Sequence, residues 1–309
     1  LYTYKSLLMK TVFIAGGTGL IGKRLSQLLA GDFQVYILSR RPLADNGKIK
    51  YLVWKPEEGM IEAGTLKPDI IINLAGAGIA DQRWSGKRKN EIIQSRTQAT
   101  LCINTWLQTI NHVPEIYIGA SAIGYYGDRA MELLDEKSSP GSGFLSNSVE
   151  LWESAHSTIS AKKKAIIRIG VVLSTCGGAL PKMLMNVKWM RMLSYFGSGK
   201  QMVSWIHIDD LCQVFLKTLQ QDQLSGIINA VSPQPIDNKT MTRQIAKALP
   251  FFTWTAPAPA FLLKMVLGEM SHVVLDSTRV FPVVLLENGF DFKFPAFKEA
   301  INDLWLHKI

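Results

Sequence analysis

Short apolar runs alternate with longer segments of helical periodicity over roughly the first 170 residues of the chain. Apolar runs of this kind predict strands that are covered on both faces of a sheet, and the longer segments predict helices at 87–110 and 144–161. Strands and helices in strict alternation indicate βαβ units, so we expect an α/β fold of Rossmann type with a doubly wound parallel sheet. The expected strands are 11–15, 34–38, 51–54, 69–76, 115–121 and 164–170.

The alternation loosens after Val171, where Gly and Pro punctuate shorter elements. We therefore expect a nucleotide-binding domain over 9–171, with later strands contributed from 203–232. Residues 172–309 are expected to form a smaller C-terminal lobe on the substrate side. Residues 1–8 precede Met9 and lack the apolar core of a signal peptide, so we interpret them as an extension without a role in the fold.

A glycine-rich turn separates the first expected strand from the first helix. Its sequence runs from Gly16 through Thr18, Gly19, Leu20 and Ile21 to Gly22. Free backbone N–H groups at a helix N-terminus favour an anion, and glycine lets a phosphate approach the backbone. Because a strand precedes the turn and a helix follows it, the pattern predicts a nucleotide-phosphate site.

The second expected strand ends in Ser39, Arg40 and Arg41. An NAD-binding unit usually places Asp or Glu there to hold the ribose 2′-hydroxyl, whereas a guanidinium pairs with a 2′-phosphate. The sequence therefore predicts NADP as the cofactor, with Ser39 and Arg40 at its ribose. Trp54 is expected either beside the adenine ring or in the core.

Composition and charge narrow the range of functions. The chain has 309 residues, a net charge of +9 and three widely spaced Cys residues. The basic residues form only short groups without interleaved aromatic residues, so we expect a small-molecule substrate and no nucleic-acid partner. The widely spaced cysteines are expected to be reduced, which favours a cytoplasmic protein. No spacing of His or Cys residues predicts a metal site. No apolar run is long enough to span a membrane, so we expect no membrane partner.

Several further stretches together resemble an atypical "epimerase family" subgroup of the extended short-chain dehydrogenase/reductases, which are NAD(P)-dependent and epimerase/dehydratase-like. The resemblance implies a Rossmann-type domain that binds NADP(H), together with a family-specific C-terminal domain over about 250–309. It also places Leu74, Ala75, Gly76, Arg96 and Ser121 at the cofactor, and we expect Gly170 there too. The stretches that carry it are 16–22, 73–76 with 79–84, 95–96, 121–127, 205–210, and 279–282 before 289–290.

The chain departs from the wider class at the residues that transfer protons. A Tyr and a Lys one helical turn later are expected in the helix near residue 145, but Leu145 and Val149 stand there. Neither side chain can transfer a proton. Ser121, Tyr125 and Tyr126 are therefore the catalytic candidates.

Two functions stay open at this point. One is an NADP(H)-dependent oxidoreductase or epimerase-like enzyme acting on a small or nucleotide-linked carbonyl or hydroxyl substrate. Members of this class often form dimers, so a homodimer is compatible with this function. The other is a non-catalytic NADP(H)-binding sensor or interaction protein. His207 and Asp209 could suggest a hydrolase with Ser121, but they fit a strand end and a helix cap, with Asp209 or Asp210 as the cap.

Overall fold

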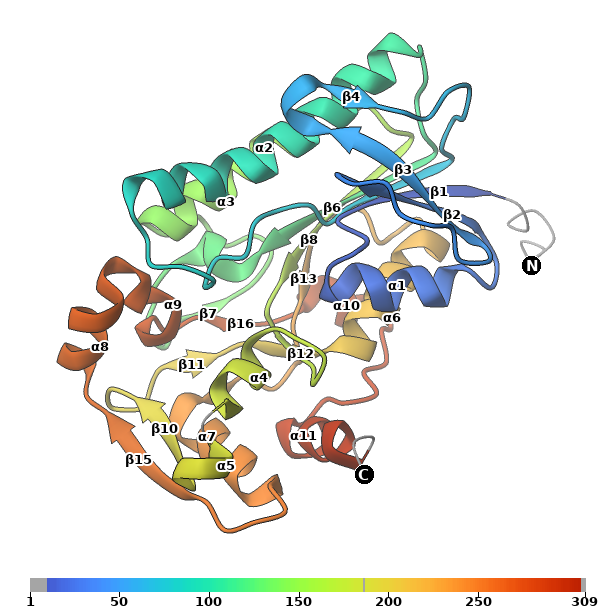
Figure 1. The fold of residues 1–309 in the computed structure, drawn as a ribbon. Helices are drawn as coiled ribbons and strands as arrows, with labels where there is room; N and C mark the ends of the chain where they lie inside the picture. The colour runs from blue at the N-terminus through green and yellow to red at the C-terminus, as the bar shows by residue number, and fades with distance from the viewer. Residues whose placement is uncertain (1–9, 186, 307–309) are drawn as a thin grey trace.

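The computed structural model describes residues 10–185 and 187–306 (Figure 1). The expected extension over 1–8, and Met9 after it, lie outside the described residues. In the part of the chain that is described, no helix combines the length and the apolar character that a membrane span requires.

A central sheet of eight strands organises the molecule, in the order β13-β8-β6-β5-β1-β2-β3-β4. The strands are parallel except β4, which runs antiparallel to β3. The order reverses between β1 and β5, so the predicted doubly wound Rossmann-type sheet is confirmed. The strands are β1 (Thr11–Ala15), β2 (Gln34–Ser39), β3 (Ile49–Lys55), β4 (Met60–Ile61), β5 (Ile70–Asn73), β6 (Ile116–Ala122), β8 (Lys163–Ile169) and β13 (Gly226–Ala230).

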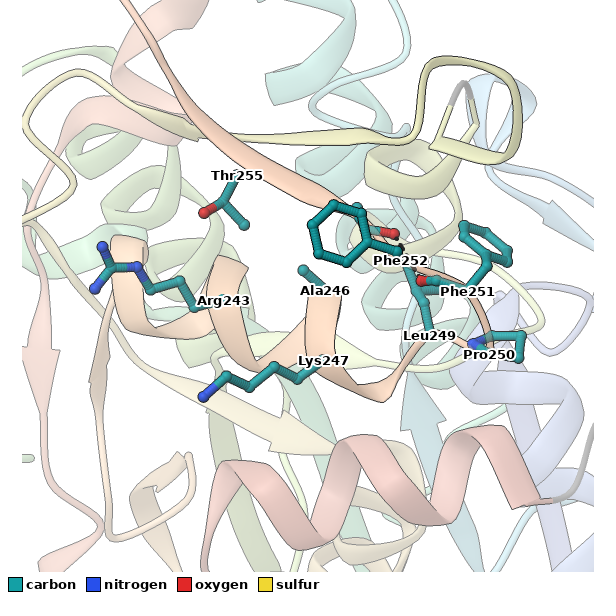
Figure 2. A pocket seen from close by; sticks show the side chains of 9 residues that line it. Arg243, Ala246, Lys247, Leu249, Pro250, Phe251, Phe252 and Thr255 are labelled. Carbon is teal, nitrogen blue, oxygen red and sulfur yellow. Dashed lines mark hydrogen bonds between the residues drawn. The ribbon is translucent and has the colours of Figure 1, made fainter.

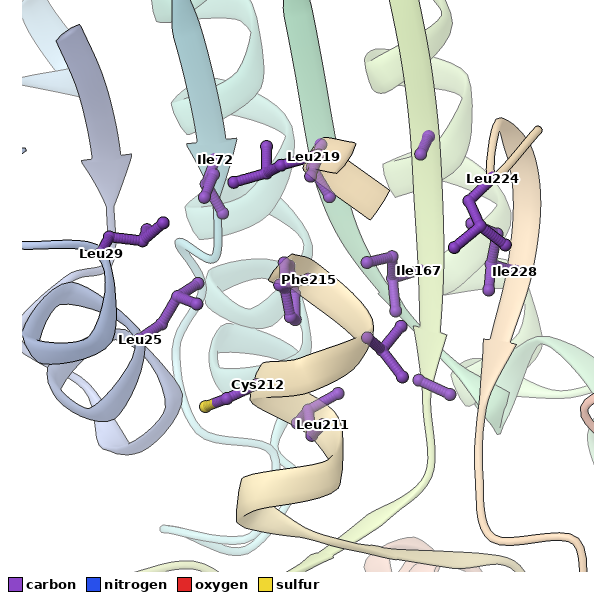
Figure 3. Close-up of a cluster of buried hydrophobic side chains, with 14 of the residues drawn as sticks. Leu25, Leu29, Ile72, Ile167, Leu211, Cys212, Phe215, Leu219, Leu224 and Ile228 are labelled. Carbon is purple, nitrogen blue, oxygen red and sulfur yellow. The ribbon is translucent and has the colours of Figure 1, made fainter. Parts of the chain in front are cut away.

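Helices cover both faces of this sheet because successive strand residues point to opposite sides. Val12 and Ile14 of β1 pack with α1 (Leu20–Leu29) and α6 (Ile208–Gln220), and Figure 3 shows part of this layer around Phe215. Phe13 of β1 instead packs toward α2 (Gly86–Thr109), and α3 (Phe144–Ser157) lies beside α2. Each face therefore has its own apolar core.

Two predicted elements are shorter than expected. The strand predicted over 69–76 ends at Asn73, whose side-chain oxygen accepts a hydrogen bond from the Ala75 amide. The helix predicted over 144–161 ends at Ser157, and Ile159 begins the connection to β8. The early end of β5 frees residues 74–76 to line a cavity.

A smaller lobe follows β8, although β13 returns to the main sheet. Its core gathers around Trp205, Ile245 and Phe297. Its strands are β9 (Val171–Leu173), β10 (Met192–Phe196), β11 (Met202–Val203), β12 (Trp205–His207), β14 (Ile236–Asp237), β15 (Trp254–Ala258) and β16 (Arg279–Val280), which pairs with β7 (Leu133–Leu134). The helices of this part of the chain are α4 (Ala179–Leu184), α5 (Val187–Met190), α7 (Asn238–Ala248), α8 (Ala260–Leu267), α9 (His272–Leu275), α10 (Val283–Glu287), which packs against β13, and α11 (Phe297–Leu306), with the 3-10 turn η4 (Gly268–Ser271). The 3-10 turns η2 (Pro56–Glu58) and η3 (Ile123–Tyr126) lie earlier, after β3 and β6.

Candidate cofactor site

The glycine turn between β1 and α1 leaves no room for a side chain at Gly16 or Gly22. Gly16 has φ +75°, and a Cβ there would lie 2.7 Å from the Leu74 carbonyl oxygen. A Cβ on Gly22 would lie 2.5 Å from the Gly16 carbonyl oxygen. Glycine at these two positions therefore lets the start of α1 and the end of β5 close around the turn.

The first turn of α1 has no side-chain cap. Gly19 is the N-cap residue, and its own amide donates to the Gly16 carbonyl at 3.0 Å. No acidic residue stands in the first turn. The early amides of a helix lack intrahelical acceptors, so this end of α1 presents donors and the positive end of the helix dipole to an anion.

A cavity of about 430 Å³ opens beside this turn, at the carboxyl ends of the strands. Nine of the predicted cofactor residues line it. The position agrees with the crevice that open α/β sheets form where the strand order reverses. The nine residues are Gly16, Thr18, Gly19, Ser39, Arg40, Trp54, Leu74, Ala75 and Gly76.

The residues after β2 differ in their position. Arg40 lines the cavity and its side chain is exposed, whereas Arg41 is exposed but does not line it. Ser39 is buried, and its hydroxyl donates to the Arg41 carbonyl at 2.7 Å. The guanidinium of Arg40 is therefore the cation at this end of the cavity.

Six predicted cofactor residues do not line the cavity: Leu20, Ile21, Gly22, Arg96, Ser121 and Gly170. The first three form the first turn of α1. Arg96 is buried against Gly76, with its guanidinium 4.9 Å from the centre of the Trp152 ring, and burial lowers its pKa to about 10, with Arg88 adding to the shift. Gly170 packs against the Ser204 backbone. Their contact with a cofactor stays a prediction.

One face of α2 supplies a wall of the cavity that sequence reasoning missed. The residues recur at intervals of three and four, so they share a helix face. Grouping the residues of the predicted helix 87–110 by helix face would have identified these polar residues. They are Glu91, Gln94, Ser95 and Gln98, and Glu57 lines the cavity from η2.

A second polar cluster lies at the ends of β6 and β8. Ser121 and Arg168 are register partners on these neighbouring strands. Arg168 donates to Glu153 of α3 through Nε and Nη2, each at 2.8 Å, and the Ser121 hydroxyl donates to the same carboxylate at 2.5 Å. The ion pair is buried, with side-chain exposures of 4% for Arg168 and 13% for Glu153. Its geometry is bidentate, which is the strong form of this pair.

The paired tyrosines adjoin this ion pair. The Tyr126 hydroxyl is fully buried, accepts from Arg168 Nη1 at 3.0 Å and donates to Asn229 Oδ1 at 2.8 Å. Burial raises the pKa of Tyr126 to about 12, and the nearby Arg168 only partly opposes this. Tyr125 is half-buried, and its ring centre lies 3.4 Å from the guanidinium carbon of Arg168. Tyr126 therefore acts here as a support for Arg168, and Tyr125 is the more accessible phenol.

Leu145 and Val149 lie close to this cluster. They are the nearest side chains to the position that a Cβ on Gly124 would take, at 3.6 and 3.8 Å. Val149 is buried. The helix expected to carry a proton-transferring Tyr and Lys is present as α3, but the apolar side chains of Leu145 and Val149 occupy those two positions.

The sequence predicted Asp209 or Asp210 as the N-cap of the helix that follows β12, and this prediction is wrong. His207 is the N-cap residue of α6, and its Nδ1 accepts from the Asp209 amide at 3.1 Å. Asp210 accepts the amides of Lys293 and Phe294 at 2.9 Å each, and Asp209 pairs with Arg24. These side chains are engaged in structural contacts, which agrees with the structural interpretation of this stretch.

The fold and the cavity together define an α/β protein of the Rossmann class with a cavity at the carboxyl ends of its parallel strands. The model of the NAD dependent epimerase/dehydratase family matches residues 12–230, and the chain belongs to this family. A second model, described as a domain of unknown function, matches residues 258–304.

Curated relatives match over nearly their full length. An epimerase family protein of Staphylococcus saprophyticus is 36% identical over 306 residues, which is 96% of this chain and 99% of that protein. An epimerase family protein of Staphylococcus aureus strain N315 is 33% identical over 303 residues, with the same coverage.

Two solved structures also resemble this chain. The human epimerase family protein SDR39U1 (isoform 2), solved with NADPH, superposes with a TM-score of 0.84 at 28% identity and covers 95% of this chain and 98% of that chain. A nucleoside-diphosphate sugar epimerase from Corynebacterium glutamicum has a TM-score of 0.70 at 28% identity over 97% of this chain and 60% of that chain.

Proposed function

We propose that this protein binds NADP(H) in the cavity beside the glycine turn. One observation carries the proposal: the uncapped N-terminus of α1 and the guanidinium of Arg40 lie on the same cavity. The NADPH in the human relative supports the choice of cofactor. The residues fit the group, because Gly16 and Gly22 let the turn close tightly, and Gly19, which lines the cavity, has no side chain to bar an anion from the N-terminus of α1.

The parts of the cofactor follow from the chemistry of the lining. The amides of Leu20 and Ile21 would hold the pyrophosphate, and Arg40 would hold the 2′-phosphate by a charge-assisted pair. Leu74, Ala75 and Gly76 would leave room for the sugars at the end of β5. The bound cofactor would supply the transfer of a hydride to or from a carbon of the substrate.

We propose an oxidoreductase or epimerase-like reaction on a small or nucleotide-linked carbonyl or hydroxyl compound. The position of Ser121 and Tyr125 at the end of β6, beside a buried cation, supports this assignment. Ser121 would orient the reacting oxygen, with Glu153 fixing its hydroxyl. Tyr125 is the residue we assign to proton exchange, and Tyr126 would position Arg168.

Calorimetry and thermal unfolding test the cofactor assignment. Saturating NADPH should raise the melting temperature in proportion to the logarithm of its concentration, and more than equal NADH does. An unchanged melting temperature with both nucleotides would contradict the proposal.

A non-catalytic NADP(H)-binding sensor is the second candidate, because Leu145 and Val149 replace the proton-transferring pair. Stereospecifically deuterated NADPH, incubated with an extract of small metabolites, separates the two functions. An enzyme transfers deuterium to a product and loses this transfer in Tyr125→Phe. A sensor binds the nucleotide and transfers no label.

A further inference from the structure

The smaller lobe carries a second hollow of about 750 Å³, which the proposed function does not use. It lies between α7 and the segment that leads into β15, and it is open to solvent. Figure 2 shows Phe252 above Ala246, with Arg243 and Lys247 extending from the helix toward the same end. The lining residues are Arg243, Ala246, Lys247, Leu249, Pro250, Phe251, Phe252, Thr253 and Thr255.

The hollow is cationic. Arg243 and Lys247 stand one helical turn apart on α7, and within the described ranges neither side chain makes an ion pair or a hydrogen bond. A smaller hollow of about 270 Å³ adjoins it, because Leu249 and Phe251 line both, and this one adds Lys188. Among the described residues that line the two hollows there is no Asp or Glu. Charge complementarity therefore calls for an anionic occupant.

Large exposed aromatic side chains lie on or next to the lining segments: Phe252 lines the larger hollow, Trp254 stands between the lining residues Thr253 and Thr255, and Trp189 follows the lining residue Lys188 in the chain. Phe252 is 73% exposed, Trp254 65% and Trp189 86%. The rings of Phe252 and Trp254 meet edge to face at 5.1 Å, and the guanidinium of Arg191 lies 4.1 Å from the centre of the Phe251 ring. Trp, Phe and Arg are enriched at protein–protein contacts, and a small molecule within the hollow would leave Trp189 in water.

A sheet edge borders the same hollow. Within the described residues, β15 pairs with β10 and with no other strand. Thr255 of this strand, and Thr253 just before it, line the hollow. Pro257 on this edge has no N–H to donate, so an extended segment would pair with the main chain only around Thr255, while its side chains alternate between the two sides.

We propose that this surface binds an extended acidic segment of a partner protein. The segment would lie between β15 and α7, with carboxylates on Arg243 and Lys247 and an apolar side chain against Phe251 and Phe252. A second copy of this chain is a poor occupant, because a two-fold contact brings the same cations together. A concave surface beside a strand edge fits a protein segment better than a membrane.

Binding of labelled peptides to the full chain tests the proposal. The probe is a fluorescein-labelled peptide of about ten residues in which Glu or Asp alternates with Leu or Phe, a length typical of a strand. The comparison peptide has Lys in place of every acidic residue. Fluorescence anisotropy should show binding of the acidic peptide alone, weakened about tenfold or more by Arg243→Glu with Lys247→Glu, the loss of roughly one charged contact. Phe252→Ser should also weaken it, and Lys298→Glu, at an exposed position of α11 that lines neither hollow, should not.

Four results would overturn the proposal. The first is no binding of the acidic peptide, and the second is equal weakening by Lys298→Glu and the paired reversal. The third is sedimentation with vesicles of phosphatidylcholine and phosphatidylglycerol, lost in the Phe252→Ser variant, because the surface then belongs to a membrane. The fourth is a dimer in analytical ultracentrifugation that Phe252→Ser dissociates, because the occupant is then a second copy. NADPH binding by the same variants reports separately on the proposed function.

Discussion

Arg168 holds Glu153 through two parallel hydrogen bonds of 2.8 Å, buried between β8 and α3. Removing one charge leaves the other buried and unpaired, which typically costs about 3–5 kcal/mol. We therefore expect Glu153→Gln to lower the free energy of unfolding by about this amount, as urea unfolding followed by circular dichroism would show.

A paired substitution is the control for this prediction. Replacing both charges, in Glu153→Met with Arg168→Met, should recover most of the stability, since an apolar pair leaves no uncompensated charge. A Glu153→Gln protein as stable as the parent would show that the pair carries little of the folding free energy.

Arg40 should decide between the phosphorylated and the unphosphorylated cofactor. Arg40→Asp replaces a cation on the cavity by an anion, so we expect NADPH affinity in calorimetry to fall by about 1.5–3 kcal/mol or more, with NADH affinity nearly unchanged. Arg41→Asp is the matched control, because Arg41 is exposed but does not line the cavity. Equal losses for both nucleotides, or for both variants, would contradict the 2′-phosphate assignment.

Gly22 should tolerate no side chain. A Cβ there would meet the Gly16 carbonyl oxygen at 2.5 Å, so Gly22→Ala should destabilise the protein by about 1–3 kcal/mol and weaken NADPH binding. Gly86 begins α2 with open space around its Cβ position, so Gly86→Ala should leave stability unchanged or raise it by about 0.5–1 kcal/mol. Thermal unfolding of the two variants compares them directly, and similar melting temperatures would contradict the steric argument.

His156 should make stability depend on pH. It is fully buried between Tyr117 and the Ala120 carbonyl, and burial lowers its pKa from 6.5 to about 4. Between these values the unfolded chain binds a proton that the folded chain excludes, so stability is full above pH 6.5 and falls as the pH drops toward 4.

Urea unfolding at several pH values measures this effect. In His156→Gln the slope of the unfolding free energy between pH 4 and 6.5 should decrease by up to about 1.4 kcal/mol per pH unit. Burial also lowers the pKa of His207, which leaves part of the slope in the variant. His112→Gln serves as the comparison, and an identical slope in His156→Gln and the parent would refute the prediction.

Six of the eight strands of the main sheet could be predicted because each contains an apolar run, whereas β4, with two residues, is too short to show one. The glycine turn could be found because its backbone geometry demands glycine. Local patterns of this kind lie within a few neighbouring residues. Residues 74–76 were wrongly added to a strand, because the hydrogen bond from the Ala75 amide to Asn73 that turns the chain is not visible as hydropathy.

The ion pair in the polar cluster could not be predicted from the sequence, although Ser121, Tyr125 and Tyr126 beside it were named as candidates. Glu153 and Arg168 stand 15 positions apart on a helix and a strand, and only the packing of α3 on the sheet brings them together. His207 took the capping role expected of Asp209 or Asp210, because Asp210 is drawn away to the Lys293 and Phe294 amides. Contacts between distant segments decide these roles.

The edge strand β13 is synthesised only after much of the smaller lobe, yet it completes the main sheet against β8. During translation, the hydrogen-bonding edge of β8 therefore stays unpaired by β13 until residue 230 has left the exit tunnel of the ribosome. Premature termination between β8 and β13 would release fragments with this edge unpaired, and such fragments are prone to aggregate.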